Sequence, residues 1–137
     1  SAPDSLSPTP GADVTEQGGA VAVTVQLAGL GGSTATGTAN VLDNGDGRTQ
    51  IGLTVNGAAP GERAAHVHEG TCEQLGAPVG ALQTVSVTGA GSATAVVSAI
   101  DLPPATVMDG RHAISVHEPN GNPGAPEICG NIPARTR

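Results

Sequence analysis

Histidine and acidic residues occur together at two places in the chain, with the spacing of metal ligands. The first is the stretch AAHVHEGTC at residues 64–72, where His66 and His68 are two residues apart and Cys72 follows. Alternate residues of a β-strand point to the same face, so these imidazoles would lie side by side, about 7 Å apart along the strand. Cations such as Cu²⁺ and Zn²⁺ favour imidazole nitrogen and need three or four donors. The pair therefore needs a third ligand from elsewhere.

The stretch HAISVHE at residues 112–118 offers that ligand. It ends in VHE, as does the HVHE of residues 66–69, and each is followed by a loop that carries a cysteine. His112 and His117 are five residues apart, so a regular strand points them to opposite faces and only one can join the pair unless a bulge intervenes. Spacing does not choose between them. The alternative is that the first pair is an ordinary surface pair and binds nothing.

The segments that must position these histidines have the pattern of short β-strands. The 21 glycines and 11 prolines provide turns between runs of Val, Ile, Leu and Thr, and no stretch has a sustained 3.6-residue period, so we expect little or no helix. The predicted strands cover residues 20–28, 33–43, 48–55, 63–69, 82–89, 92–100 and 112–118. This spacing predicts an all-β Greek-key β-sandwich or flattened barrel of about eight antiparallel strands.

Three segments between these strands are not predicted to be regular strands. Residues 70–81, which hold Cys72, and residues 119–131 are predicted loops, with brief pairing expected for ICGNI at 128–132. Residues 101–110 contain adjacent prolines and cannot form a central strand.

The chain is long enough for one domain of ordinary size. Residues 1–18 contain three prolines and almost no large apolar side chain. They are predicted to be a flexible leader between a processing or lipid-attachment site and the domain, which would cover residues 19–137.

The two cysteines bear on stability and on compartment. The sequence has no Phe, Tyr or Trp, so the core must be filled with Val, Ile, Leu and Ala, and a covalent link would support it. Cys72 and Cys129 are far apart in a small β-rich chain, which is typical of a structural disulfide in an oxidising space. The alternative is two free, buried thiols. The disulfide predicts an extracytoplasmic protein, which is secreted, periplasmic or lipid-anchored.

The net charge of −7, with no lysine in the chain, argues against nucleic acid or an anionic membrane as a partner, since both select basic patches. It does not exclude an anionic small substrate, which responds to local charge. No apolar run approaches the roughly 18–20 residues of a membrane span. The sequence does not fix the oligomeric state.

Several motifs occur in an order that resembles the copper/zinc superoxide dismutase family. They are HVHE at 66–69 followed by Cys72, SATAVVSA at 92–99, GRHAISVHE at 110–118, and GNPGAPEICGNI at 121–132. The resemblance covers most of the expected domain. It implies a Greek-key fold and a copper site.

Carried over by position, the resemblance implies three copper ligands and one disulfide. His66 and His68 fall on the two ligands of the family's His-Val-His, and His117 falls on the ligand of its late Val-His-Glu strand. Cys72 and Cys129 fall on the family's intrasheet disulfide.

Two departures from the family concern the metals. His112 has no ligand counterpart, so we interpret it as a strand-start or surface histidine. The family places the bridging histidine and further zinc ligands soon after its first cysteine, but GTCEQLGAPVGALQTV at residues 70–85 contains no histidine. We therefore expect one copper ion on three histidines and no zinc.

A third departure concerns the substrate. The family has an arginine three residues before its second cysteine that orients superoxide, and this chain has Pro126 there. Arg63, Arg135 and Arg137 are possible substitutes, but nothing in the sequence places them.

Three functions follow from these patterns. The first is an extracytoplasmic copper-binding protein with a copper donor or acceptor protein as partner. The second is a copper-only superoxide dismutase of reduced efficiency, since electrostatic steering contributes about 10- to 10³-fold to association. The third is a metal-free structural or interaction module.

Overall fold

The computed structural model describes residues 13–17, 20–89, 93–119 and 122–135. In this part of the chain, nine strands form one antiparallel curled sheet and two short strands form a second. The strands are β1 (Asp13–Gln17), β2 (Ala20–Gly29), β3 (Thr36–Asp43), β4 (Thr49–Asn56), β5 (Gly61–Arg63), β6 (Ala65–Thr71), β7 (Gln74–Ala81), β8 (Val85–Val87), β9 (Thr94–Ile100), β10 (His112–Glu118) and β11 (Asn122–Ile132).

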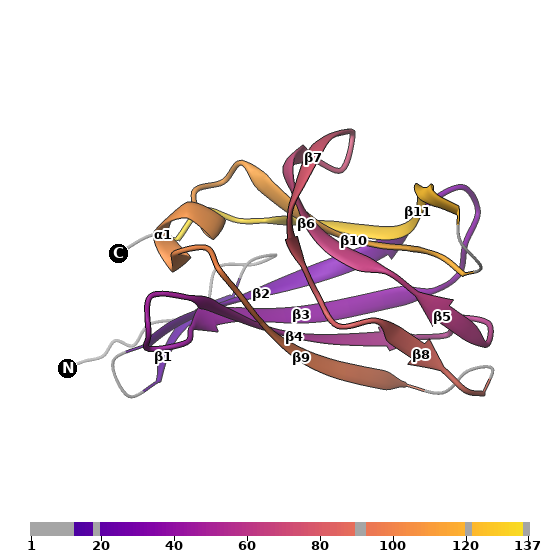
Figure 1. Ribbon diagram of the computed structural model, residues 1–137, viewed down its shortest axis with the longest axis horizontal. Coiled ribbons are helices and arrows are strands. Elements are labelled where there is room, and N and C mark those ends of the chain that lie inside the picture. The colour runs from indigo at the N-terminus through magenta and orange to yellow at the C-terminus, as the bar shows by residue number, and fades with distance from the viewer. Residues whose placement is uncertain (1–12, 18–19, 90–92, 120–121, 136–137) are drawn as a thin grey trace.

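The large sheet has the order β7-β6-β10-β11-β2-β3-β4-β9, and β1 pairs with β2 outside this path. The sheet curls into two layers, with β6, β10 and β11 facing β2, β3, β4 and β9 (Figure 1). The short strands β5 and β8 pair at one end of the molecule. The prediction of an all-β sandwich or flattened barrel is confirmed.

The core fills the space between the two layers and consists of aliphatic side chains. Strand β4 shows why: its burial alternates, with Ile51, Leu53 and Val55 at 0–1% exposure and the residues between them only partly buried. From the facing layer, Val67 of β6 and Ile114 of β10 are both fully buried. The alternation seen in the sequence therefore marks the inward face of each layer.

Little helix was predicted, and the helix described is a single turn. Helix α1 (Pro104–Val107) lies in the proline-containing segment between β9 and β10. Pro104 stands at its start, where a missing amide hydrogen is tolerated. The prediction that residues 101–110 form no central strand is confirmed.

Both predicted loops are wrong over most of their length. Residues 74–81 form β7 and residues 122–132 form β11. The pairing expected for ICGNI at 128–132 is confirmed, since these five residues pair with β10. Neither segment has the alternation of apolar and polar residues from which the strands were predicted. Strand β7 lies at an edge of the sheet, where Pro78 is tolerated. Strand β11 pairs with β10 through register shifts on both sides of His117, so its prolines lie where the ladder is irregular.

The predicted leader lies mostly outside the described residues. Within it, Asp13–Gln17 forms β1 and pairs with β2 along its whole length. The sheet therefore includes residues that the sequence assigned to the leader.

Candidate metal centre

Two neighbouring antiparallel strands, β6 and β10, bring three of the histidines together. Their register places Ser115 opposite His66, and Ala113 opposite His68. Cross-strand partners and alternate residues share a face, so both β6 histidines lie on the face that carries Ser115. His117 is two residues further along β10, and its amide donates to the Ala64 carbonyl over 2.8 Å. All three imidazoles therefore stand on one face of the sheet.

The three rings lie close enough to share one ion. One nitrogen from each of His66, His68 and His117 lies within 4.8 Å of the other two, and the ring centroids are 5.4–5.9 Å apart. Ligand nitrogens at about 2.0–2.1 Å from a zinc or copper ion are roughly 3.5 Å from one another. The rings would therefore have to converge by on the order of 1 Å. The residues fit a three-imidazole metal site.

The hydrogen bonds of His68 leave one nitrogen ready for a metal. Its Nδ1 lies 3.0 Å from the carbonyl oxygen of Gly76. Because a carbonyl only accepts, Nδ1 carries the proton, and the lone pair is on Nε2. Among the described residues, neither this Nε2 nor Nδ1 of His66 has a hydrogen-bond partner, although both atoms are buried. Buried polar atoms without partners are rare, and a bound cation would satisfy both.

Burial also favours the neutral form of His66, and a histidine that ligates a metal must be neutral. His68 and His117 are 8% and 4% exposed, whereas His66 is only partly buried. Burial lowers the pKa of His66 below its usual value of 6.5, and the neighbouring His68 lowers this pKa further. Protons therefore compete less strongly for His66 than for a free imidazole.

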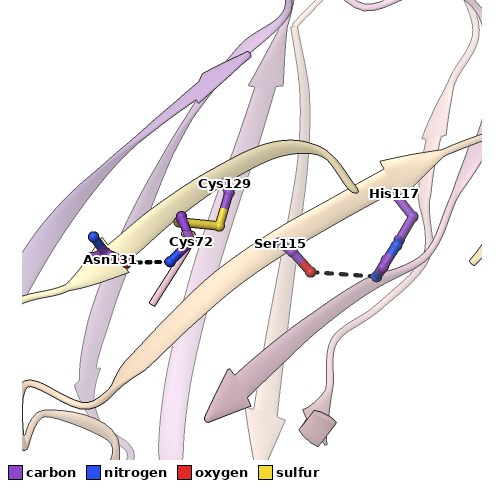
Figure 2. Close-up of a disulfide and its surroundings, with 5 residues drawn as sticks. All are labelled: Cys72, Ser115, His117, Cys129 and Asn131. Carbon is purple, nitrogen blue, oxygen red and sulfur yellow. Dashed lines mark hydrogen bonds between the residues drawn. A yellow bond between two sulfur atoms is a disulfide. The ribbon is translucent and has the colours of Figure 1, made fainter. Parts of the chain in front are cut away.

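The predicted disulfide is present and lies beside the cluster. Cys72 and Cys129 are joined with their Cα atoms 5.9 Å apart, and Cys129 pairs with Ser115 across β10 and β11. The Cys72 amide also donates to the Asn131 side chain over 2.8 Å. Figure 2 shows this attachment of the residue after β6 to β11. It fixes the β6–β7 hairpin, from which the carbonyl that orients His68 comes.

Ser115 stands between the disulfide and His117. It is fully buried, and its Oγ lies 3.4 Å from Nε2 of His117 (Figure 2). This hydroxyl was not predicted as part of the site, and neither was the Gly76 carbonyl. Register with a histidine strand could have indicated Ser115. No side-chain signal exists for a backbone carbonyl.

No model of a known protein family matches this chain, and no curated protein matches it. The resemblance to copper/zinc superoxide dismutases therefore stays a prediction from sequence motifs. Among the described residues, no helix is sufficiently long and apolar to span a membrane.

The structure keeps His112 apart from the other histidines. It is the first residue of β10, and its Nδ1 lies 3.0 Å from Asp109 Oδ1. Its register partner is Glu69, on the opposite face from Ser115. The interpretation as a strand-start residue is confirmed. The alternative of a surface position is wrong, because His112 is only 7% exposed.

Arg63 does not replace the missing arginine. It is 1% exposed, its Nε donates to Glu127 Oε1 over 2.8 Å, and its Nη1 donates to the Ala59 carbonyl over 2.6 Å. Ser33 donates to the other oxygen of Glu127. The guanidinium therefore serves a buried ion pair. Pro126 lies opposite His117 in the register of β10 and β11.

Proposed function

We propose that this protein is an extracytoplasmic copper-binding protein of superoxide dismutase-like fold. It holds one copper ion through His66, His68 and His117 and has no zinc site. The observation that carries the proposal is the convergence of three imidazole nitrogens within 4.8 Å, two of them on histidines with buried nitrogens that lack a partner among the described residues.

The donor set favours copper over the other common divalent metals. It consists of imidazole alone, and for nitrogen ligands the affinity of first-row metals rises to a maximum at Cu²⁺ and falls at Zn²⁺. The segment after Cys72, where the resembled family carries its zinc ligands, contains no histidine. Hard ions such as Mg²⁺ and Ca²⁺ prefer oxygen ligands, which this group lacks.

The disulfide supports the extracytoplasmic part of the proposal. Disulfides persist in oxidising compartments and are rare in the cytosol. The Cys72–Cys129 link therefore indicates an oxidising setting. Copper in such a setting would be exchanged with an external donor or acceptor.

Copper titration of the purified chain tests the proposal. We expect one Cu²⁺ per chain, with an electron paramagnetic resonance spectrum of nitrogen ligation, and retention of copper against equimolar zinc. His66→Ala and His117→Ala should each weaken binding at least tenfold. His112→Ala is the matched control, since it removes an imidazole from the opposite face of β10 and should leave the affinity unchanged. Binding that survives both ligand variants would contradict the three-histidine site.

A copper-only superoxide dismutase is the second candidate, favoured by the partial exposure of His66. An open side of the cluster would allow a small molecule to reach the metal. Copper would supply the redox chemistry by accepting an electron from one superoxide and donating an electron to another. The protein's part would be to hold the three imidazoles in place and leave that side open.

A superoxide assay separates the candidates. Dismutation by the loaded protein above that of the same copper in buffer would favour the enzyme, while stoichiometric copper without activity favours the binding protein. Copper affinity no higher than that of an unfolded histidine-rich peptide would favour the metal-free module.

A further inference from the structure

A second candidate site is a pocket of about 630 Å³ at the end of the molecule where α1 lies (Figure 1). It contains none of the three histidines of the metal centre. The end of β6, the start of β10 and the segment between α1 and β10 form its wall, which includes Glu69, Thr71, Thr106, Asp109, Arg111 and His112. Sites for small molecules are typically concavities of about 300–1,000 Å³ with a few polar groups that face the ligand. This pocket has the size and the polar lining of such a site.

The imidazole of His112 is held in one orientation at this pocket. The residue is only 7% exposed, and its Nδ1 lies 3.0 Å from Asp109 Oδ1. The same oxygen accepts from the Arg111 amide over 2.8 Å. Burial raises the pKa of Asp109, but the hydrogen bonds from the Arg111 amide and from His112 lower it, and the pKa lies below its usual value. Asp109 is therefore a carboxylate to which Nδ1 donates, and the lone pair of the neutral imidazole is on Nε2.

The second ring nitrogen of His112 lacks a hydrogen-bond partner in the described part of the chain. Nε2 is not one of the fully buried polar atoms, and His112 lines the pocket, so a molecule in the pocket can reach this atom. Polar atoms of buried side chains normally have a partner. A ligand with a hydrogen-bond donor would supply the partner that Nε2 lacks.

Two exposed side chains of opposite charge line the same pocket without pairing with each other. Glu69 is the register partner of His112, so their Cβ atoms lie on one face of the sheet, about 4.5–5.5 Å apart. An ammonium group has three donors and can therefore contact Glu69 and Nε2 of His112 together. Neither Glu69 nor the guanidinium of Arg111 forms a salt bridge within the described residues. A guanidinium in this state is suited to a carboxylate, which it can bind through two parallel hydrogen bonds.

We propose that this pocket binds a small zwitterion, a molecule with a primary ammonium group and a carboxylate, such as a free α-amino acid. The ammonium contacts Glu69 and Nε2 of His112, and the carboxylate contacts the guanidinium of Arg111. An amine without a carboxylate would leave Arg111 unpaired. A metal ion fits this pocket poorly, because among the described residues only the three histidines of the metal centre form a group of close metal ligands. The proposal does not depend on copper binding.

Titration of the metal-free protein with L-alanine, followed by NMR, tests the proposal. Propionate and ethylamine are the matched ligands, since each carries one of the two charged groups of alanine. Amino acids chelate copper, so the metal is removed first, and the outcome is independent of the proposed function. L-Alanine should bind at least about tenfold more tightly than either matched ligand, because its second contact is made by a molecule that is already bound. Binding of propionate or ethylamine as tight as that of L-alanine would overturn the proposal.

The amide signals that shift on addition of L-alanine locate the ligand. Shifts are expected at Gly70, Thr71 and Arg111, which line the pocket. The signals of His66 and His117, which do not line it, should keep their positions. Shifts at these two histidines in place of the pocket residues would put the amino acid at the metal centre and would overturn the proposal.

Charge variants test the two contacts separately. Glu69→Gln should reduce the affinity for L-alanine to that for propionate, and Arg111→Gln should reduce it to that for ethylamine. Glu62→Gln and Arg48→Gln are the matched controls, because they remove the same charges from positions that do not line the pocket. Glu62 is exposed on β5, at the other end of the molecule (Figure 1), and Arg48 lies between β3 and β4. Both controls should keep the wild-type affinity. An equal loss in the controls would show that net charge, and not the pocket, governs binding, and would overturn the proposal.

Discussion

Removing the disulfide is expected to destabilise the protein by about 4 kcal/mol. The variant is Cys72→Ala combined with Cys129→Ala, which opens a link between residues 57 apart in sequence. In the chain-entropy model, a loop of that length lowers the entropy of the unfolded chain by about 14 cal/mol/K, which is about 4 kcal/mol at 25 °C. The net stability of small domains is typically about 5–15 kcal/mol, so this link is a large part of the total.

Urea denaturation measures the loss. With a slope of about 1–3 kcal/mol per molar urea, the midpoint should fall by roughly 2 M. Wild-type protein with its disulfide reduced is the control and should share the midpoint of the double variant. A loss below about 1 kcal/mol would refute the reasoning, since the unfolded chain would then gain little freedom from the missing link.

The remaining predictions concern the hairpin, the buried ion pair and pH. Gly70→Ala should destabilise the protein by about 1–3 kcal/mol and weaken copper binding in a titration. Gly70 has φ +95°, and a Cβ there would contact a carbonyl across the hairpin. Gly45→Ala is the control, because Gly45 has φ +92° in open space and its replacement should lower stability alone. Glu127→Ala should cost about 3–5 kcal/mol in urea denaturation by leaving a buried guanidinium unpaired, and adding Arg63→Met should recover much of it. The pKa of His66 lies below its unfolded value near 6.5, so on acidification through 6.5 the unfolded chain takes up its proton first. The stability of the metal-free protein should thus be fully present above pH 6.5 and decline below it, less steeply in His66→Gln; an equal decline in that variant would contradict the assignment.

The sequence was sufficient to predict those strands that have one apolar and one polar face. The predicted strand at 112–118 has the same bounds as β10, and the alternation of residues 48–55 corresponds to the buried face of β4. It was insufficient for β7 and β11, where glycine and proline interrupt any alternation. Those strands are held by backbone pairing to β6 and β10, which no side-chain pattern records.

The candidate site was also predictable only in part: its histidines were predicted, but their hydrogen-bond partners were not. The two-residue spacing of His66 and His68 placed both on one face of a strand. The resemblance to the superoxide dismutase family, and not the spacing, selected His117 as the third ligand. The carbonyl of Gly76 could not be predicted, because it depends on how the hairpin after Cys72 folds back. The role of Arg63 was open for the same reason: its partner, Glu127, is 64 residues away in sequence.

The two faces of β6 and β10 separate stability from metal binding. Ala65 and Val67 alternate with the histidines on β6 and are buried in the core, as is Ile114 on β10. The imidazoles stand on the opposite face, so a ligand can be replaced without opening a cavity in the core. His66→Ala should therefore fold with nearly wild-type stability when metal-free and lose only the increase in melting temperature that copper gives the wild type. If that variant unfolds, the cluster contributes to the fold itself, and affinity losses in the ligand variants would have to be measured against a folded control such as His66→Gln.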